Sequence, residues 1–155
     1  MNDNFGNYLI QKIIEDVCYE RKKEILLIIQ QNFLILGVSP HGTRVVQKII
    51  ESVFNFPDLI AIFISVFDAN MISLIKDVNG NHIIIKFVNI YKSPVNDFIY
   101  RLLNDHIVEI STDKHGCCVI QKCIEAANND QQVILIFILR ELWFQQLSRI
   151  HSISF

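Results

Sequence analysis

The most constraining feature of the chain is one helical pattern that occurs four times at nearly constant spacing. The copies begin at Phe5, His41, Asn79 and His115 and read FGNYLIQKIIE, HGTRVVQKIIE, NGNHIIIKFVN and HGCCVIQKCIE. Their glycines, at positions 6, 42, 80 and 116, are 36, 38 and 36 residues apart. Such a period is typical of stacked repeats, in which each unit buries its apolar face against its neighbours. The sequence therefore predicts an all-α solenoid whose four units share one continuous core.

Each repeat is expected to contain three helical segments. The aligned copies carry a wide apolar stripe at helical spacing. A second amphipathic stretch follows each copy, at 20–31, 57–67, 94–103 and 130–146, with Pro57 and Pro94 at the first helical position and Ser93 as an N-cap. A short third segment precedes the next glycine, at 32–38, 70–76 and 106–111. We expect repeats at 1–31, 32–68, 69–104 and 105–146, with 147–155 as the start of a truncated fifth.

A polar residue stands three positions before each of the four glycines. These residues are Asp3, Ser39, Asp77 and Asp113. Short polar side chains of this kind favour turns and helix starts. We therefore expect a tight polar turn before each aligned helix, with the glycine required by the geometry of that turn.

Composition narrows the classes of function. The chain is 51% apolar, but its longest apolar runs, 59–64 and 133–139, are far shorter than the roughly 18 residues of a membrane span. The N-terminus does not follow the pattern of a signal peptide, so we expect a cytoplasmic protein that does not enter a membrane. A net charge of −2 argues against binding nucleic acid by bulk attraction, so any such binding must come from a local surface.

The sequence predicts neither an enzyme nor a cofactor or metal site. It contains no nucleophile elbow, no phosphate-binding glycine loop and no H-E-x-x-H motif. His115, Cys117, Cys118 and Cys123 lie close together in sequence, but adjacent helical positions point about 100° apart and cannot easily converge on one ion.

The polar residues of the aligned copies recur at three positions, which follow the glycine by one, two and five residues. The first and the last of these are four residues apart and therefore lie on the same face of a helix. Amide side chains there suit the donors and acceptors of a nucleobase edge, and flat side chains beside them suit stacking. We name these the first edge position (Asn7, Thr43, Asn81, Cys117), the stacking position (Tyr8, Arg44, His82, Cys118) and the second edge position (Gln11, Gln47, Ile85, Gln121). The alternative is a set of solvated polar residues on an exposed stripe.

With these motifs the chain resembles the Pumilio, or Puf, family of RNA-binding repeats, whose three-helix units carry the same G-x-x-V-I-Q-K pattern. The resemblance covers nearly the whole chain, and the order of the polar positions resembles the second to fifth repeats of an eight-repeat domain. It implies a curved solenoid that binds single-stranded RNA with one base per repeat. It also implies post-transcriptional control of messages through their 3′ untranslated regions, with co-repressor proteins as partners.

The resemblance further implies a base preference. Asn7 with Gln11 would read uracil, Thr43 with Gln47 adenine, Asn81 with Ile85 a uracil, and Cys117 with Gln121 adenine. Because the family binds RNA antiparallel to its repeats, the implied element is 5′-AUAU-3′. Two departures weaken it: Ile85 stands where an amide is expected, and Cys118 at a stacking position is neither flat nor cationic.

A lysine follows the second edge position in every copy, at Lys12, Lys48, Lys86 and Lys122. These lysines would form a basic stripe that attracts phosphates. Alternatively, the pairs Lys12–Glu15, Lys48–Glu51 and Lys122–Glu125 are i, i+3 ion pairs that hold helices or repeats together, and we favour this interpretation.

Two other functions stay open. The solenoid could be a scaffold that binds a peptide or a partner helix, or a Puf-like ribosome-assembly factor that binds RNA without base selectivity. The ends of the array carry no sequence typical of capping repeats, so we also expect exposed apolar faces and self-association.

Overall fold

The computed structural model describes residues 5–152, without the side chains of residues 138, 141, 142 and 145–152. Within this range the chain is helical, and no strand is present. The helices are α1 (Gly6–Asp16), α2 (Tyr19–Gln30), α3 (Phe33–Val38), α4 (Gly42–Ser52), α5 (Pro57–Lys76), α6 (Asn81–Ile90), α7 (Asp97–Asp105), α8 (Ile107–Ser111), α9 (Lys114–Ala126) and α10 (Asn129–Ser152).

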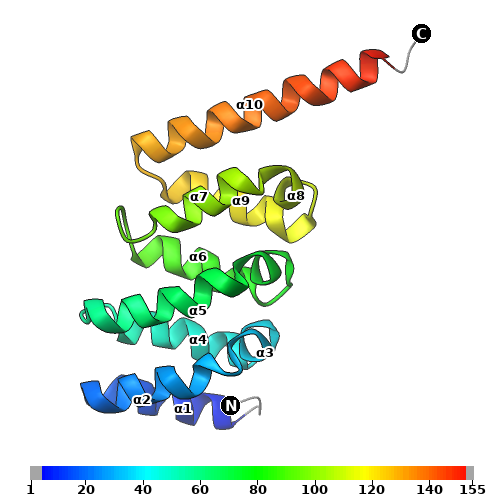
Figure 1. Ribbon diagram of the computed structural model, residues 1–155. Helices are drawn as coiled ribbons and strands as arrows, with labels where there is room; N and C mark the ends of the chain where they lie inside the picture. The colour runs from blue at the N-terminus through cyan, green and yellow to red at the C-terminus, as the bar shows by residue number, and fades with distance from the viewer. Residues whose placement is uncertain (1–4, 153–155) are drawn as a thin grey trace.

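The helices stack into a solenoid of two layers (Figure 1). The four aligned copies form α1, α4, α6 and α9, and each of these helices packs on the next. The helices that follow them, α2, α5, α7 and α10, form the outer layer, and the short helices α3 and α8 lie along one side. This arrangement confirms the predicted all-α solenoid.

The core between the layers is continuous from one repeat to the next. Phe63 and Phe67 of α5 contact Phe33 of α3, with ring centroids 5.6 and 6.3 Å apart, and Phe87 of α6, at 5.9 and 5.3 Å. Phe87 in turn lies 5.6 Å from Phe98 of α7. Because each ring is shared between neighbouring repeats, no repeat can bury its apolar face alone.

Two helix boundaries differ from the expected ones. The segments expected at 57–67 and 70–76 form one helix, α5, which begins at Pro57 as predicted and runs to Lys76, across the expected repeat boundary at 68. Asn70 stays inside it, with its amide donating to the Val66 carbonyl at 2.8 Å. In contrast, α7 begins at Asp97 and not at Pro94, so Ser93 is not its N-cap. Pro94 lies in the preceding turn after a cis peptide bond.

The polar turns before the aligned helices form as predicted where they can be described. The Asp113 carboxylate accepts hydrogen bonds from the backbone N–H groups of His115 and Gly116, at 2.8 and 2.9 Å, and Asp77 and Ser39 accept equivalent bonds. Asp3 and residues 153–155 lie outside the described residues, and residues 147–152 continue α10.

The reason for the glycines is not the one expected. No glycine among the described residues has a positive φ. Instead, a Cβ at Gly116 would lie 2.1 Å from the Ile110 carbonyl oxygen, and one at Gly42 2.4 Å from that of Leu36. The close approach of the preceding short helix, and not the turn conformation, therefore excludes a side chain.

Helix α5 is long and apolar enough to meet the criteria for a membrane span. No uninterrupted apolar run in the sequence is long enough to do so. The helix is 20 residues long, and an 18-residue stretch of it has a mean hydropathy of 1.8 and is 44% buried within the molecule. Its buried side chains include Leu59, Phe63, Phe67 and Leu74. These contacts are those of a core helix in the array.

Candidate nucleic-acid interface

The side-by-side packing of α1, α4, α6 and α9 brings the three recurring polar positions onto one surface. All four stacking residues, Tyr8, Arg44, His82 and Cys118, are exposed. The Arg44 guanidinium donates to the Tyr8 hydroxyl at 3.3 Å, so the stacking residues of the first two repeats touch each other. Flat groups exposed on adjacent helices can hold a base between them once such a contact opens.

The second edge position is accessible in every repeat. Gln121 is exposed, and Gln11, Gln47 and Ile85 are partly exposed. The amides of Gln11 and Gln47 can therefore present a donor and an acceptor to a ligand. Ile85 can offer only apolar contact at the same place in the third repeat.

The first edge position is buried in three of the four repeats. Asn7 is 0% exposed, Thr43 4% and Asn81 5%, whereas Cys117 is exposed. The Asn7 side-chain oxygen accepts a hydrogen bond from Gln11 at 3.0 Å, and the Thr43 hydroxyl accepts one from Gln47 at 3.4 Å. In the first two repeats these residues therefore orient the glutamine amide.

The third and fourth repeats lack this arrangement. The Asn81 amide donates to the carbonyls of Asp77 and Val78, at 2.8 and 2.9 Å, so both of its hydrogens are used within the turn. The Cys117 thiol donates to the Ser111 carbonyl at 2.9 Å and does not contact Gln121. Ile85 already indicated part of this difference in the sequence, but the hydrogen bonds of Asn81 and Cys117 to the preceding turn are visible only in the structure.

A hollow of about 220 Å³ lies between the first two repeats. Both glutamines and both stacking residues line it, together with Lys48, Glu51 and Lys86. The amides and the flat groups of two repeats thus converge on one space, which has charged side chains along one edge.

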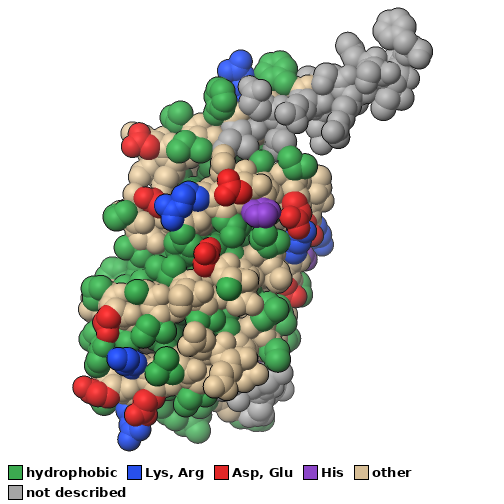
Figure 2. All heavy atoms as spheres, in the orientation of Figure 1, with side chains coloured by type: hydrophobic (Ala, Val, Ile, Leu, Met, Phe, Trp, Pro, Cys, Tyr) green, Lys and Arg blue, Asp and Glu red, His purple; other side chains and the backbone are tan. Residues whose placement is uncertain are grey.

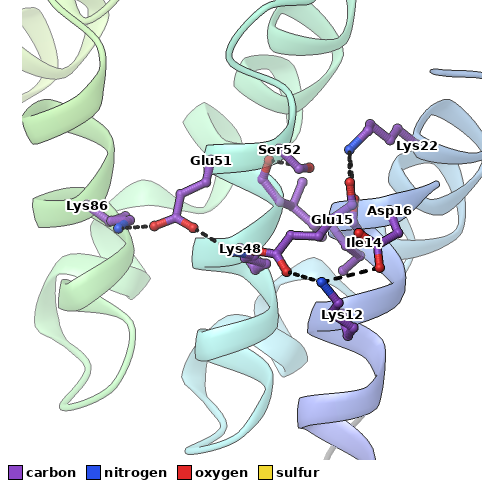
Figure 3. Close-up of polar contacts among 10 residues, drawn as sticks. Lys12, Ile14, Glu15, Asp16, Lys22, Lys48, Glu51, Ser52 and Lys86 are labelled. Carbon is purple, nitrogen blue, oxygen red and sulfur yellow. Dashed lines mark hydrogen bonds and ion pairs between the residues drawn. The ribbon is translucent and has the colours of Figure 1, made fainter. Parts of the chain in front are cut away.

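Ion pairs hold the lysines beside this surface (Figure 3). The predicted i, i+3 pairs are present: Lys12–Glu15 at 3.4 Å, Lys48–Glu51 at 3.2 Å and Lys122–Glu125 at 2.6 Å. Sequence reasoning did not pair residues across repeats, yet Lys48 also binds Glu15, and Lys86 binds Glu51. Lys48 and Lys86 therefore link neighbouring repeats, whereas Lys12 and Lys122 pair within their own helices.

The cross-repeat ion pairs lower the pKa of their carboxylates. The hydrogen bond from Lys48 lowers the pKa of Glu15, and the one from Lys86 lowers the pKa of Glu51. Asn89 occupies the register of Glu15, Glu51 and Glu125 in the third repeat, so Lys122 pairs only within its own helix among the described residues. The series of cross-repeat pairs ends there.

Comparison with known proteins identifies the family. The model of the Pumilio-family RNA binding repeat matches residues 1–29, 32–63 and 106–139. The chain belongs to the Pumilio family. Its repeats are an RNA-binding fold and not a known enzyme family.

Individual relatives agree with this assignment. The chain is 39% identical to Pumilio homolog 12 of Arabidopsis thaliana over 88% of its own length, and 35% identical to Suppressor protein MPT5 of Saccharomyces cerevisiae over 83%. It spans only 23% and 16% of these two relatives. The matched segments therefore represent less than a quarter of either protein.

Solved structures of Puf domains share the fold. The Puf4 RNA binding domain bound to the HO endonuclease RNA 3′ UTR recognition sequence is 36% identical, with a TM-score of 0.84 over 90% of this chain and 43% of that one. The RNA-binding domain of yeast Puf5p bound to AAT2 RNA is 31% identical, with a TM-score of 0.79 over 92% of this chain and 41% of that one.

Proposed function

We propose that this Pumilio-family chain binds single-stranded RNA along α1, α4, α6 and α9, with one base per repeat. The observation that carries the proposal is the convergence of two oriented glutamines, Gln11 and Gln47, and two exposed flat residues, Tyr8 and Arg44, on one hollow. Glutamine amides supply hydrogen bonds to base edges, and the flat groups supply stacking of about 1–3 kcal/mol per base.

The proposed element is 5′-AUAU-3′, with the first adenine at the fourth repeat and the last uracil at the first. Selectivity should be strongest at the third and fourth bases, because Thr43 orients Gln47 and Asn7 orients Gln11. It should be weakest at the second base, where Ile85 offers no hydrogen bond and the Asn81 amide hydrogens are already used.

In this proposal the four lysines contribute little phosphate attraction to RNA binding. Each is bound to at least one carboxylate, so each contributes less net positive charge than a free lysine. Binding should therefore depend less steeply on salt than four free phosphate contacts would require.

We also propose a cytoplasmic role in the post-transcriptional control of messages that carry A/U-rich elements, together with co-repressor proteins. The similarity to Puf domains bound to 3′ UTR recognition sequences supports this role. No catalytic step belongs to it.

The test is fluorescence anisotropy at fixed salt with a labelled RNA that contains AUAU. We expect saturable binding that weakens when adenines are replaced by cytosines or when RNA is replaced by DNA. Gln47→Ala should weaken it by about 1 kcal/mol, roughly fivefold, because one hydrogen bond to the base is lost. Gln30→Ala, at an exposed position of α2 in the outer layer, is the matched control and should have no effect.

Equal binding of all oligonucleotides, with a steep salt dependence, would show a nonspecific RNA-binding protein instead. No binding by a folded sample would contradict the proposal and favour the scaffold function.

A further inference from the structure

A groove in the outer layer lies apart from the proposed RNA surface. It runs between α5 and α7, is bounded by the loop at 91–96, and has a volume of about 730 Å³. Helix α2 packs along α5, and α7 packs on α10, whereas α5 and α7 pack on each other less extensively, with the edge of Phe98 against Phe67 at a centroid distance of 6.0 Å. The groove is therefore a break in the packing of the outer layer.

The break arises from the start of α7. Helix α2 begins at Tyr19, 13 residues after Gly6, whereas α7 begins at Asp97, 17 residues after Gly80. Residues 92–96 instead form a turn, in which the Val95 N–H donates to the Lys92 carbonyl and the Asn96 side-chain amide to the Tyr91 carbonyl, both at 2.9 Å. A loop replaces the first turn of α7, and the space that this turn would fill is open to solvent.

The floor of the groove is apolar and its rim is partly exposed. Ile60 and Ile64 of α5 and Phe98 of α7 form the floor. Phe54 and Val95 stand at the rim, 51% and 36% exposed. The space-filling view shows hydrophobic side chains on the face that contains α5 and α7 (Figure 2). Concave apolar surfaces with a few polar groups are typical of binding sites.

The charged residues that line the groove are both cationic. Lys92 and Arg101 are exposed, and no carboxylate lines the groove. The Arg101 guanidinium has no hydrogen-bond or ion-pair partner among the described residues, whereas Lys92 donates to the Val88 carbonyl at 3.2 Å. The nearby carboxylate of Asp97 is held by Gln131 at 2.6 Å. Arg101 also lines a neighbouring hollow with Asp97, Asp105 and Asp130, but none of these carboxylates forms an ion pair with it among the described residues, so its guanidinium can bind an anion from outside.

We propose that this groove is a docking site for a short acidic segment of a partner protein. An aliphatic or aromatic side chain of the segment packs on the apolar floor, and a neighbouring carboxylate pairs with Arg101, where the guanidinium can bind it in bidentate fashion. RNA fits the groove less well, because two cations give little phosphate attraction and the floor is apolar. The site also lies in the opposite layer from the proposed base-reading helices.

The test is a selection of random peptides displayed on phage, with the whole chain as target and excess AUAU RNA present. Affinities of the enriched peptides are then measured by anisotropy against the unaltered chain and three variants. Arg101→Glu reverses the free charge, and Ala61→Trp fills the groove from an exposed position of α5 that lines it. Lys23→Glu makes the same kind of charge reversal on the exposed surface of α2 and is the matched control.

We expect enriched peptides that combine Asp or Glu with a large apolar residue. Their affinity should fall at least about tenfold in Arg101→Glu and in Ala61→Trp, and stay unchanged in Lys23→Glu. RNA affinity should be the same for all four proteins, and circular dichroism should show that all are folded.

Three results would overturn the proposal. One is the absence of any enriched peptide. Another is a set of peptides whose affinity for both groove variants equals their affinity for the unaltered chain. The third is a loss of RNA affinity in Arg101→Glu, which would assign the groove to RNA. Failure of RNA binding in the unaltered chain would concern the proposed function alone, because the peptide measurement does not depend on it.

Discussion

At the scale of single residues, the four repeats have polar positions in the same register, but the side chains at these positions form different hydrogen bonds. In each of the first two repeats the glutamine amide is oriented by donating a hydrogen bond to the residue four positions earlier, Asn7 or Thr43. The third has Ile85 in place of the glutamine, and the fourth has an exposed Cys117 in place of the buried residue. We therefore expect the repeats to differ in how strictly they select a base.

Ile85→Gln should restore selectivity at the second base. Ile85 is partly exposed and packs only in part against the core, so a glutamine there loses some apolar contact but gains an amide toward the base. We expect affinity for AUAU to rise by about 1 kcal/mol relative to RNA with another base in that place. Anisotropy with the four RNA variants measures this difference.

The control for this change is Ile85→Met, which keeps an apolar side chain of similar size. Equal affinity of Ile85→Gln for all four RNA variants would show that the third repeat does not contact a base.

The free energy of unfolding should depend on pH through Asp113, and a substitution at this residue can measure that dependence. The hydrogen bond from the Gly116 N–H lowers its pKa below 3.8, and that from His115 adds to the effect. Because the folded pKa is lowered, the ionised carboxylate stabilises the fold above the unfolded pKa, and this contribution is lost as the pH falls through the folded pKa. Asp113→Asn, which keeps an acceptor oxygen, should therefore destabilise the protein at neutral pH and cease to do so in strong acid.

Urea unfolding of both proteins at neutral pH and at a series of falling acid pH values measures how the difference shrinks. Asp68→Asn is the control, since Asp68 is exposed in α5 without a hydrogen-bond partner among the described residues. Equal stability of Asp113→Asn and the unaltered protein at pH 7 would refute the prediction.

At the scale of helices, neighbouring copies of the aligned helix are joined by ion pairs as well as by their core. Lys48 of α4 binds Glu15 of α1, and Lys86 of α6 binds Glu51 of α4. Asn89 interrupts the series between α6 and α9, because it cannot pair with Lys122. The joint between the third and fourth repeats is therefore held without such a pair among the described residues.

Asn89→Glu should complete the series. The new carboxylate would stand three residues after Lys86 and in the register that binds the lysine of the next repeat. We expect a gain of a few tenths to about 1 kcal/mol in the free energy of unfolding, because the pair is partly exposed. Thermal unfolding at low salt measures it, and the gain should shrink at about 1 M salt.

Asn89→Gln, which has the same length without the charge, should give no gain. If the two variants are equally stable at low salt, the cross-repeat pairs contribute nothing measurable.

At the scale of the whole molecule, exposed apolar side chains gather on the first repeat, with Leu9 and Ile28 among them, and on the last helix. Exposed apolar side chains of α10 include Ile136, Phe137, Trp143 and Phe144, each more than half exposed. A helix that presents this much apolar surface favours association with another surface. We expect the chain to form a concentration-dependent dimer through α10.

Sedimentation velocity over a range of concentrations measures this association. Phe137→Glu should shift the equilibrium toward the monomer, because a charge would be buried in the contact. Val78→Glu is the control, since Val78 is equally exposed, at 57% against 58%, but lies before α6. A monomer at all concentrations for the unaltered chain would rule out the dimer.

The sequence by itself determined the repeats, the helices at their centres and the i, i+3 ion pairs, because each depends on spacing within one segment. Spacing did not determine whether two helical segments join. Asn32 and Asn70 stand in the same register, yet Asn32 separates α2 from α3, whereas Asn70 lies inside α5. Only the tertiary structure decided this difference, the burial of Asn7, Thr43 and Asn81, and the groove beside α7. Each depends on what a neighbouring repeat places against the residue, which no spacing within one repeat records.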